Sequence, residues 1–369
     1  MSHPGPDLPS GSVHPAFPGG DRRSLAFVLA TGLLMAWGLV FQFVSEHYDS
    51  LYDDAYIYFR YVDNIVAGCG ITFNCGAPPV EGFTSPLYLA LLTLGQLAFG
   101  DLERTAQVVG TLACGGAITI SALSALDPQL LPNRRTGSFA ACVGTAAVLG
   151  VDHFFVVNAV IGMETALACL AVSLLYRAVL REAPGALAGW AIVAVLLRPE
   201  CALFVAAAPL LRFAWNRRFV IPVAVAAVCI AAVRWHVFGS IAPNTYWAKA
   251  GGTARHFQLG VEYIAMLLLS FPVVLASPLA LWSPDSRSKV SYALVVAAGW
   301  LAFFLRSGGD AYQYSRLFVP IAPVLTTLGV VGMVAGADRL RMKLGWPEYA
   351  LPRVVAVPLV LLCAYATLF

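Results

Sequence analysis

The sequence SLAFVLATGLLMAWGLVFQFV at residues 24–44 is followed by SEHYDSLY at 45–52 and by DDAYIYFRY at 53–61. The first stretch is hydrophobic and has the length of a membrane-spanning helix. Asp53 and Asp54 lie just beyond it, where burial near lipid and mutual repulsion are both costly for carboxylates. Such a pair needs a cation, a proton or a function, although both residues are also good caps for the start of a helix.

The whole chain shares the character of its first hydrophobic stretch. Of its 369 residues, 59% are hydrophobic and 12% are charged, and the mean hydropathy is +0.75. These values exclude a soluble domain, in which about a quarter of the residues are charged. We therefore expect an all-α, polytopic transmembrane helical bundle (24–369), preceded by a disordered cytoplasmic tail rich in Pro, Gly and Ser (1–23). About eleven spans are predicted, near 24–44, 104–126, 138–158, 164–180, 186–197, 201–215, 219–238, 259–281, 289–305, 317–336 and 350–369.

One further apolar stretch, Ser85–Gly100, is short and opens on Ser-Pro, so we predict a helix at the membrane interface rather than a span. With this assignment most of the Lys and Arg residues lie on one side of the membrane, as the positive-inside rule expects. If the stretch crossed, every later basic loop would change sides and the rule would fail. The charge pattern thus predicts a cytoplasmic N-terminus, an outer C-terminus and a first outer loop at 45–103.

The outer loops gather charged residues from well-separated segments. The acids Asp53, Asp54, Glu164 and Glu200 share this face with Arg198, which interrupts a hydrophobic hairpin in Arg-Pro-Glu. Charge placed against the topological bias indicates a function, although outer loops can also be simply polar. Asp53 and Asp54 suit a general base for a hydroxyl acceptor, or ligands for Mg²⁺ or Mn²⁺, and the sequence does not decide between these roles.

Two outer segments have a composition that suits a sugar phosphate. Residues 307–316, SGGDAYQYSR, combine flexible backbone with Arg316, a fork-shaped donor for phosphate. Residues 243–249, PNTYWAK, combine an amide, two aromatic rings and the ammonium of Lys249. Tyr and Trp can pack against sugars, but they also anchor helices at membrane interfaces. Arg60, in the helix predicted to start at the acid pair, could contact a phosphate or neutralise an acid.

The eight cysteines fall into two groups. Six lie in or beside predicted spans, where a free thiol behaves as a small hydrophobic residue. Cys69 and Cys75 lie in the first outer loop, in GCGITFNCG, where an oxidising periplasm would permit a disulfide that closes a short hairpin.

The run from Tyr52 to Leu89, with Asp-Asp at its head and PVEGFTSPL at 79–87, resembles the GT-C superfamily of membrane glycosyltransferases that use polyprenyl-phosphate sugars. Within it, the chain looks most like the bacterial terminal arabinofuranosyltransferases of mycobacterial cell walls and their pilin-modifying relatives. Matching motifs follow in family order over most of the chain, at GMET (162–165), RPE (198–200), PNTY (243–246) with Lys249, and GGD (308–310) with Arg316.

The resemblance implies a GT-C bundle with an outward cavity and juxtamembrane helices at Asp54–Gly68 and Ser85–Gly100. It implies inverting transfer of a sugar, arabinofuranose as the best expectation, from a polyprenyl-phosphate donor to a hydroxyl of a cell-envelope glycan or surface protein. The expected location is the bacterial inner membrane, with the active site facing the periplasm. No cofactor is required by this scheme, and Mg²⁺ or Mn²⁺ stays an open alternative.

Roles for individual residues follow from the same resemblance. Asp53 is the expected base, Asp54 its partner and Glu164 a second catalytic acid. The donor phosphate is expected to bind Arg60, Arg198, Lys249 and Arg316, and the other predicted substrate-binding residues are Glu81, Glu200, Asn244, Tyr246, Asp310 and Tyr312.

The chain departs from the pattern in three ways, one of which is Cys201, where glycine commonly follows Arg-Pro-Glu. Cys69 and Cys75 replace the polar residue and proline that are usual at those positions, which favours the disulfide. The long soluble C-terminal domain of the mycobacterial enzymes has no counterpart in this sequence, which leaves the acceptor open. A transporter or flippase of lipid-linked sugars, or a glycan polymerase or ligase, are the alternative functions.

Overall fold

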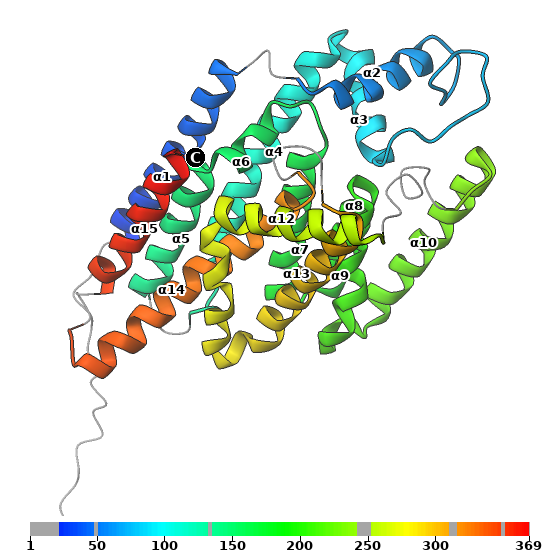
Figure 1. Cartoon of the computed structure of the whole chain (residues 1–369). Coiled ribbons are helices and arrows are strands. Elements are labelled where there is room, and N and C mark those ends of the chain that lie inside the picture. The colour runs from blue at the N-terminus through cyan, green and yellow to red at the C-terminus, as the bar shows by residue number, and fades with distance from the viewer. Residues whose placement is uncertain are drawn as a thin grey trace, which may run out of the picture.

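The computed structural model describes residues 22–47, 51–131, 135–241, 252–309, 316–347 and 351–368. Within these ranges every regular element is a helix and there is no strand (Figure 1). The all-α prediction is therefore confirmed. The predicted tail at 1–23 lies almost wholly outside the described residues.

Fourteen α-helices and seven 3₁₀ segments make up the described chain. The α-helices are α1 (Arg22–Glu46), α2 (Asp53–Val66), α3 (Pro86–Phe99), α4 (Leu102–Ser124), α5 (Arg135–Val151), α6 (His153–Val156), α7 (Thr165–Leu180), α8 (Pro184–Leu197), α9 (Ala202–Ala207), α10 (Arg217–Phe238), α12 (Ala254–Ser270), α13 (Arg287–Ser307), α14 (Ala322–Leu344) and α15 (Leu351–Leu368). The 3₁₀ segments are η1 (Val157–Ala159), η2 (Pro199–Cys201), η3 (Ala208–Leu210), η4 (Arg212–Ala214), η5 (Pro272–Trp282), η6 (Pro284–Ser286) and η7 (Val319–Ile321).

Each predicted hydrophobic run is helical, but several runs are interrupted. The axis bends by 70° between Gly137–Val151 and His153–Ala159, and by 78° between Ala254–Ser270 and Pro272–Trp282. The second bend has a local cause, because Pro272 lacks the N–H that would continue the helix. Within the described residues four helices are long and apolar enough to cross a membrane, or up to six if each bent pair is one span. The chain is a multi-pass membrane protein, and the count of eleven crossings stays a prediction.

The centre of the bundle is built on close approach of helix backbones. The first half of α14 is buried throughout, and it packs against η5. A Cβ atom added at Gly329 would lie 2.2 Å from the carbonyl oxygen of Val273, and one at Gly332 would lie 2.5 Å from that of Ala276. Small residues allow this contact, as they commonly do between membrane helices.

The α2–α3 segment (residues 51–101) covers one end of the bundle (Figure 1). Helix α3 begins where its sequence predicts, because the Ser85 hydroxyl accepts a hydrogen bond from the Tyr88 amide at 3.2 Å and Pro86 occupies the first helical position. The same Ser85 hydroxyl donates to the Leu196 carbonyl at 3.2 Å, and the Tyr88 hydroxyl donates to the Gly162 carbonyl at 2.8 Å. These bonds fix the segment over the ends of α8 and α7.

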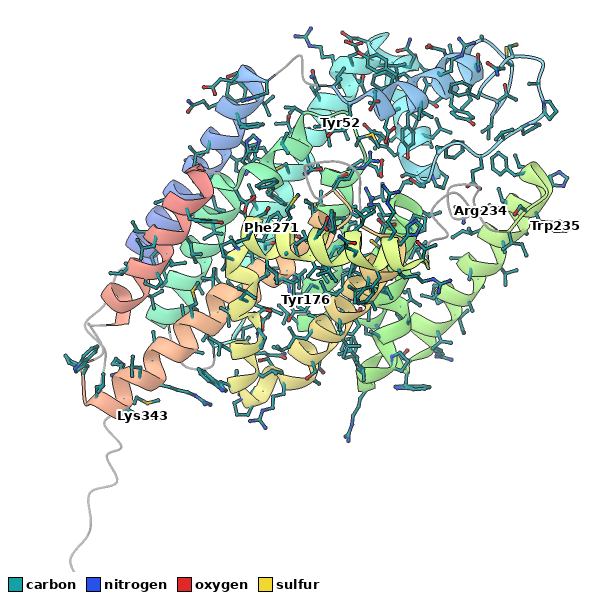
Figure 2. The ribbon with its side chains drawn as sticks, viewed as in Figure 1. Tyr52, Tyr176, Arg234, Trp235, Phe271 and Lys343 are labelled. Atoms are coloured by element: carbon teal, nitrogen blue, oxygen red, sulfur yellow. A yellow bond between two sulfur atoms is a disulfide. The ribbon has the colours of Figure 1, made fainter. Side chains whose placement is uncertain are left out.

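Helix α10 lies at the edge of the bundle and buries little of its surface (Figure 1). Its C-terminal end contacts the α2–α3 segment through an ion pair between Arg234 Nε and Glu81 Oε1, 3.1 Å apart. The rings of Phe83 and Phe238 meet beside it with centroids 6.2 Å apart. Figure 2 shows Arg234 at this end of α10.

Candidate active site

The first turn of α2 is held against the segment that precedes α7. The Tyr52 amide donates to the Ile161 carbonyl at 3.0 Å. The next residue, Gly162, has a φ of +74°, and a Cβ atom there would lie 2.6 Å from Leu51 Cδ2 and 3.0 Å from Ala55 Cβ. Only glycine suits both the backbone conformation and the space. This contact places the start of α2 against the residues that lead to Glu164.

The two aspartates have different surroundings, because successive side chains of a helix point about 100° apart. Asp54 Oδ2 forms an ion pair with Arg316 Nη1 at 2.7 Å, and the Arg316 side chain is 9% exposed. Asp53 is exposed, and its Oδ1 accepts a hydrogen bond from the Asp54 amide at 2.9 Å. Among the described residues, Asp53 has no ion-pair partner. One acid is thus neutralised by a buried cation, and the other faces outward.

A second ionic cluster surrounds Arg198, which is buried at the end of α8. Its Nε donates to Glu200 Oε1 at 2.7 Å, and its Nη1 donates to Glu164 Oε1 at 2.9 Å and to the Thr165 hydroxyl at 3.2 Å. Pro199 explains the geometry, because a residue before proline is excluded from the helical conformation and Arg198 is extended, with φ −147° and ψ 117°. The helix therefore stops where the planar guanidinium can reach both acids.

Glu164 itself offers an unused acceptor. Its Oε2 is buried and has no hydrogen-bond partner in the described parts of the chain. A buried carboxylate oxygen without a donor is rare in native proteins and needs an explanation. The hydroxyls of Tyr58 in α2 and Tyr88 in α3 belong to the same surroundings: burial, then the charge of Glu164, raises the pKa of each phenol well above its usual value. A ligand hydroxyl is one donor that would satisfy Glu164.

The structure groups some of the predicted site residues and leaves others elsewhere. Arg60 is exposed on α2, two turns beyond Asp53, where its Nε donates to the Phe73 carbonyl at 3.1 Å. Glu81 is buried against Arg234, and burial raises the pKa of its carboxyl while the arginine opposes that shift. The predictions that lie outside the described residues are Asn244, Tyr246, Lys249, Asp310 and Tyr312.

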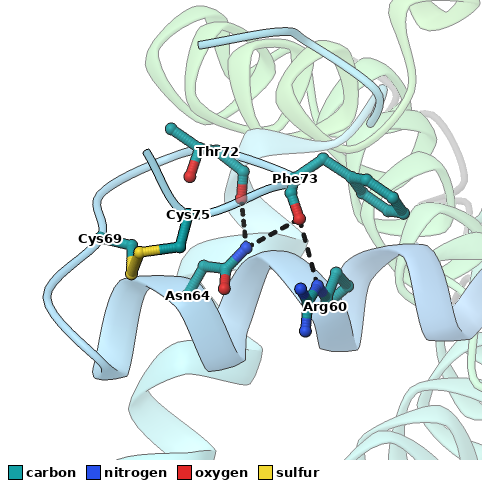
Figure 3. The surroundings of a disulfide bond; sticks show 6 residues. All are labelled: Arg60, Asn64, Cys69, Thr72, Phe73 and Cys75. Atoms are coloured by element: carbon teal, nitrogen blue, oxygen red, sulfur yellow. Dashed lines mark hydrogen bonds between the residues drawn. A yellow bond between two sulfur atoms is a disulfide. The ribbon is translucent and has the colours of Figure 1, made fainter. Parts of the chain in front are cut away.

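Cys69 and Cys75 are joined by a disulfide in the loop that follows α2 (Figure 3). As for metals, the described residues contain no group of three or more His, Cys, Asp or Glu side chains placed to hold an ion. Of the two acids proposed as metal ligands, Asp54 is paired with Arg316.

The sequence did not indicate the role of Arg234, although its predicted position on the outer face, against the charge bias, was a usable signal. The electrostatic effect of Glu164 on Tyr58 and Tyr88 was also not predicted. Arg234 and these tyrosines interact with residues far away in the sequence. An isolated sequence motif does not show which partner a buried polar side chain will contact.

This all-helical bundle, with a two-helix segment over one end, has an ArnT-like GT-C fold. Its backbone superimposes on ArnT from Cupriavidus metallidurans bound to undecaprenyl phosphate with a TM-score of 0.57 at 15% identity, covering 94% of this chain and 74% of that one. The apo state of ArnT gives a TM-score of 0.56 at 14% identity, covering 94% and 76%.

In sequence, the chain is 28% identical over 357 residues to the terminal β-(1→2)-arabinofuranosyltransferase of Mycobacterium tuberculosis (strain ATCC 25618 / H37Rv). The alignment covers 82% of this chain and 55% of the relative, so the chain spans about half the length of the curated relative it matches. No family model matches the chain. The predicted resemblance to GT-C glycosyltransferases related to arabinofuranosyltransferases is confirmed.

Proposed function

We propose that the chain is an inverting glycosyltransferase that moves a sugar, arabinofuranose, from a polyprenyl-phosphate donor to the hydroxyl of an acceptor outside the bacterial inner membrane. The observation that carries the proposal is that the two adjacent aspartates differ in pairing and in exposure. Asp54 is paired with the buried Arg316, whereas Asp53 is exposed. The sugar is suggested by the name of the curated relative, and the lipid by the undecaprenyl phosphate bound to ArnT.

In the proposed reaction Asp53 acts as the general base. Its carboxylate takes the proton of the acceptor hydroxyl as that oxygen attacks the anomeric carbon of the donor. A new carbon–oxygen bond forms on one face of the sugar while the bond to the phosphate oxygen breaks on the other, so the configuration inverts. The polyprenyl phosphate leaves as a monoester with one additional negative charge.

Arg316 is the cation best placed to stabilise the negative charge of the leaving phosphate. It is buried, and the interaction of a phosphate with a guanidinium is strengthened where water is excluded. Asp54 holds the guanidinium in position before the donor arrives. Arg198 is already shared between Glu164 and Glu200, so its part is to orient Glu164 rather than to neutralise the leaving group.

Glu164 is proposed to bind a hydroxyl of the donor sugar. Its Oε1 is held by Arg198, and its buried Oε2 lacks a donor among the described residues. A site built to accept a hydrogen bond discriminates strongly against analogues that lack the hydroxyl, because the acceptor is then left unsatisfied. A deoxy donor is therefore expected to be a poor substrate.

The experiment is transfer of label from polyprenyl-phosphate arabinose to a glycan acceptor by the purified protein in lipid nanodiscs. Asp53→Asn should lower kcat by about two orders of magnitude or more, the usual contribution of a general base. The matched control is Glu262→Gln, which neutralises an exposed acid on α12. Transfer by Asp53→Asn at the wild-type rate would refute the mechanism, and lipid movement without sugar transfer by the wild type would indicate a flippase.

A further inference from the structure

The outward face of α2 carries a continuous stripe of exposed side chains. Asp53, Tyr56, Arg60 and Asp63 are all exposed, and their spacing of three and four residues places them on one side of the helix. The opposite side is buried against the bundle. The stripe begins at the proposed base and extends about 15 Å along the helix, at 1.5 Å per residue.

A rigid loop borders this stripe. The Asn64 amide donates to the carbonyls of Thr72 and Phe73, each at 2.8 Å, and Arg60 donates to the same Phe73 carbonyl at 3.1 Å (Figure 3). The disulfide between Cys69 and Cys75 closes the loop. The Phe73 ring is nevertheless 42% exposed. The loop is thus fixed to α2 by its backbone, while its aromatic side chain faces solvent or lipid.

The Tyr56 ring is also held in place although 49% of its surface is exposed. Its hydroxyl donates to Glu103 Oε1 at the start of α4, at 2.9 Å. Its ring edge contacts Phe59, with centroids 5.3 Å apart and planes at 77°. An exposed aromatic ring that is ordered before binding loses little conformational freedom when a ligand packs on it.

The charges along the stripe indicate the net charge and the chemical class of the ligand. Negative Asp53 and Asp63 flank positive Arg60, with Glu103 alongside, so an anionic ligand would meet two or three carboxylates. The alternation of acid, ring, guanidinium and acid suits a neutral chain with many hydroxyls and apolar ring faces, which can donate to carboxylates, accept from arginine and pack on tyrosine.

We propose that the outward face of α2 and the 69–75 loop bind the acceptor as an extended, uncharged oligosaccharide and lead its terminal hydroxyl to Asp53. This inference rests on the proposed function and deepens it, since it names the acceptor class. Arg60 then belongs to the acceptor site rather than to the donor phosphate. Asp54 and Asp53, one residue apart, face the donor and acceptor sides respectively.

The test is a series of uncharged acceptors, from a monosaccharide to a hexasaccharide, in the transfer assay. For the wild type, KM should fall with acceptor length. Tyr56→Ala should raise KM for the hexasaccharide by about tenfold, equivalent to about 1.4 kcal/mol, and so reduce the dependence of KM on acceptor length. Tyr56→Phe should retain the length dependence, because it keeps the ring. The matched control is Trp235→Ala, which removes an exposed aromatic ring from α10.

Direct binding separates this inference from the proposed function. Calorimetric titration of the hexasaccharide into Asp53→Asn protein should show binding that Tyr56→Ala weakens, whether or not sugar is transferred. Transfer with no effect of acceptor length or of Tyr56→Ala would overturn the inference and leave the function standing. Tighter binding of an anionic hexasaccharide than of the neutral one would also overturn it. Binding without any transfer by the wild type would support the acceptor site and refute the transferase.

Discussion

Replacing Arg198 with methionine should strongly destabilise the protein. The substitution keeps an apolar side chain of similar length and removes the cation from between Glu164 and Glu200. The side chains of Glu164 and Glu200 are 2% and 13% exposed, so neither carboxylate can recover its full hydration. Two like charges would then face each other in a site of low dielectric.

The magnitude follows from the geometry. Opposite charges about 4 Å apart attract by about 4 kcal/mol at the effective dielectric constant of about 20 that suits protein sites. Removing one partner of a buried ion pair typically costs about 3–5 kcal/mol, because the remaining charge is buried without compensation. We therefore expect Arg198→Met to lower the free energy of unfolding by about 3–5 kcal/mol. Arg198→Lys should cost less, since an ammonium keeps the charge but cannot reach both acids with a planar fork.

The assay is the free energy of unfolding in bicelles, measured by steric trapping. The double variant Glu164→Gln with Arg198→Met should be more stable than the sum of the single effects predicts, because the more deeply buried of the two uncompensated charges, and its repulsion with Glu200, are gone. Arg104→Met is the matched control, since Arg104 is exposed and surface substitutions usually stay within about 0.5 kcal/mol. Equal effects of Arg198→Met and Arg104→Met, or strict additivity in the double variant, would refute the reasoning.

Three further changes test the surroundings of the site. Gly162→Ala should destabilise the protein by about 1–3 kcal/mol and lower kcat, because its φ of +74° and the contact with α2 both exclude a Cβ atom. Gly185→Ala is the control and should have neither effect, since a Cβ atom there meets open space. Thermal unfolding and transfer rates check both variants. Burial raises the pKa of Glu81 above its ordinary 4.5, so the folded state binds more protons than the unfolded state. The contribution of Glu81 to stability therefore falls as pH rises above 4.5. Arg234→Met should make this fall steeper and extend it to higher pH, and melting temperatures measured from pH 4.5 to 7 would show it. Cys69→Ser removes the disulfide, which contributes about 2 kcal/mol to stability through loop-closure entropy, and so should loosen the short loop. KM should rise for long acceptors only. The same change in KM, relative to wild type, for short and long acceptors would contradict this prediction.

Local signals in the sequence predicted much of the architecture. Each run that hydrophobic composition predicted as a span is helical, and the ends of α3 followed from Ser85, Pro86 and Gly100, which cap and stop a helix through contacts within one turn. The breaks inside 138–158 and 259–281 were not predicted. Pro272 is a local cause of the second bend, whereas apolar composition continues across the first bend, where α5 packs against α14 and α1.

The sequence by itself determined that the chain is helical and membrane-embedded, and that acids and arginines gather in loops, because hydropathy and charge act over a few residues. Only the tertiary structure decided which arginine meets which acid: Arg316 reaches Asp54, and Arg198 reaches Glu164. It also separated Asp53 from Asp54, adjacent in sequence but facing different surroundings. The physical reason is that desolvation and pairing energies depend on distances across the fold, and no local pattern encodes those distances.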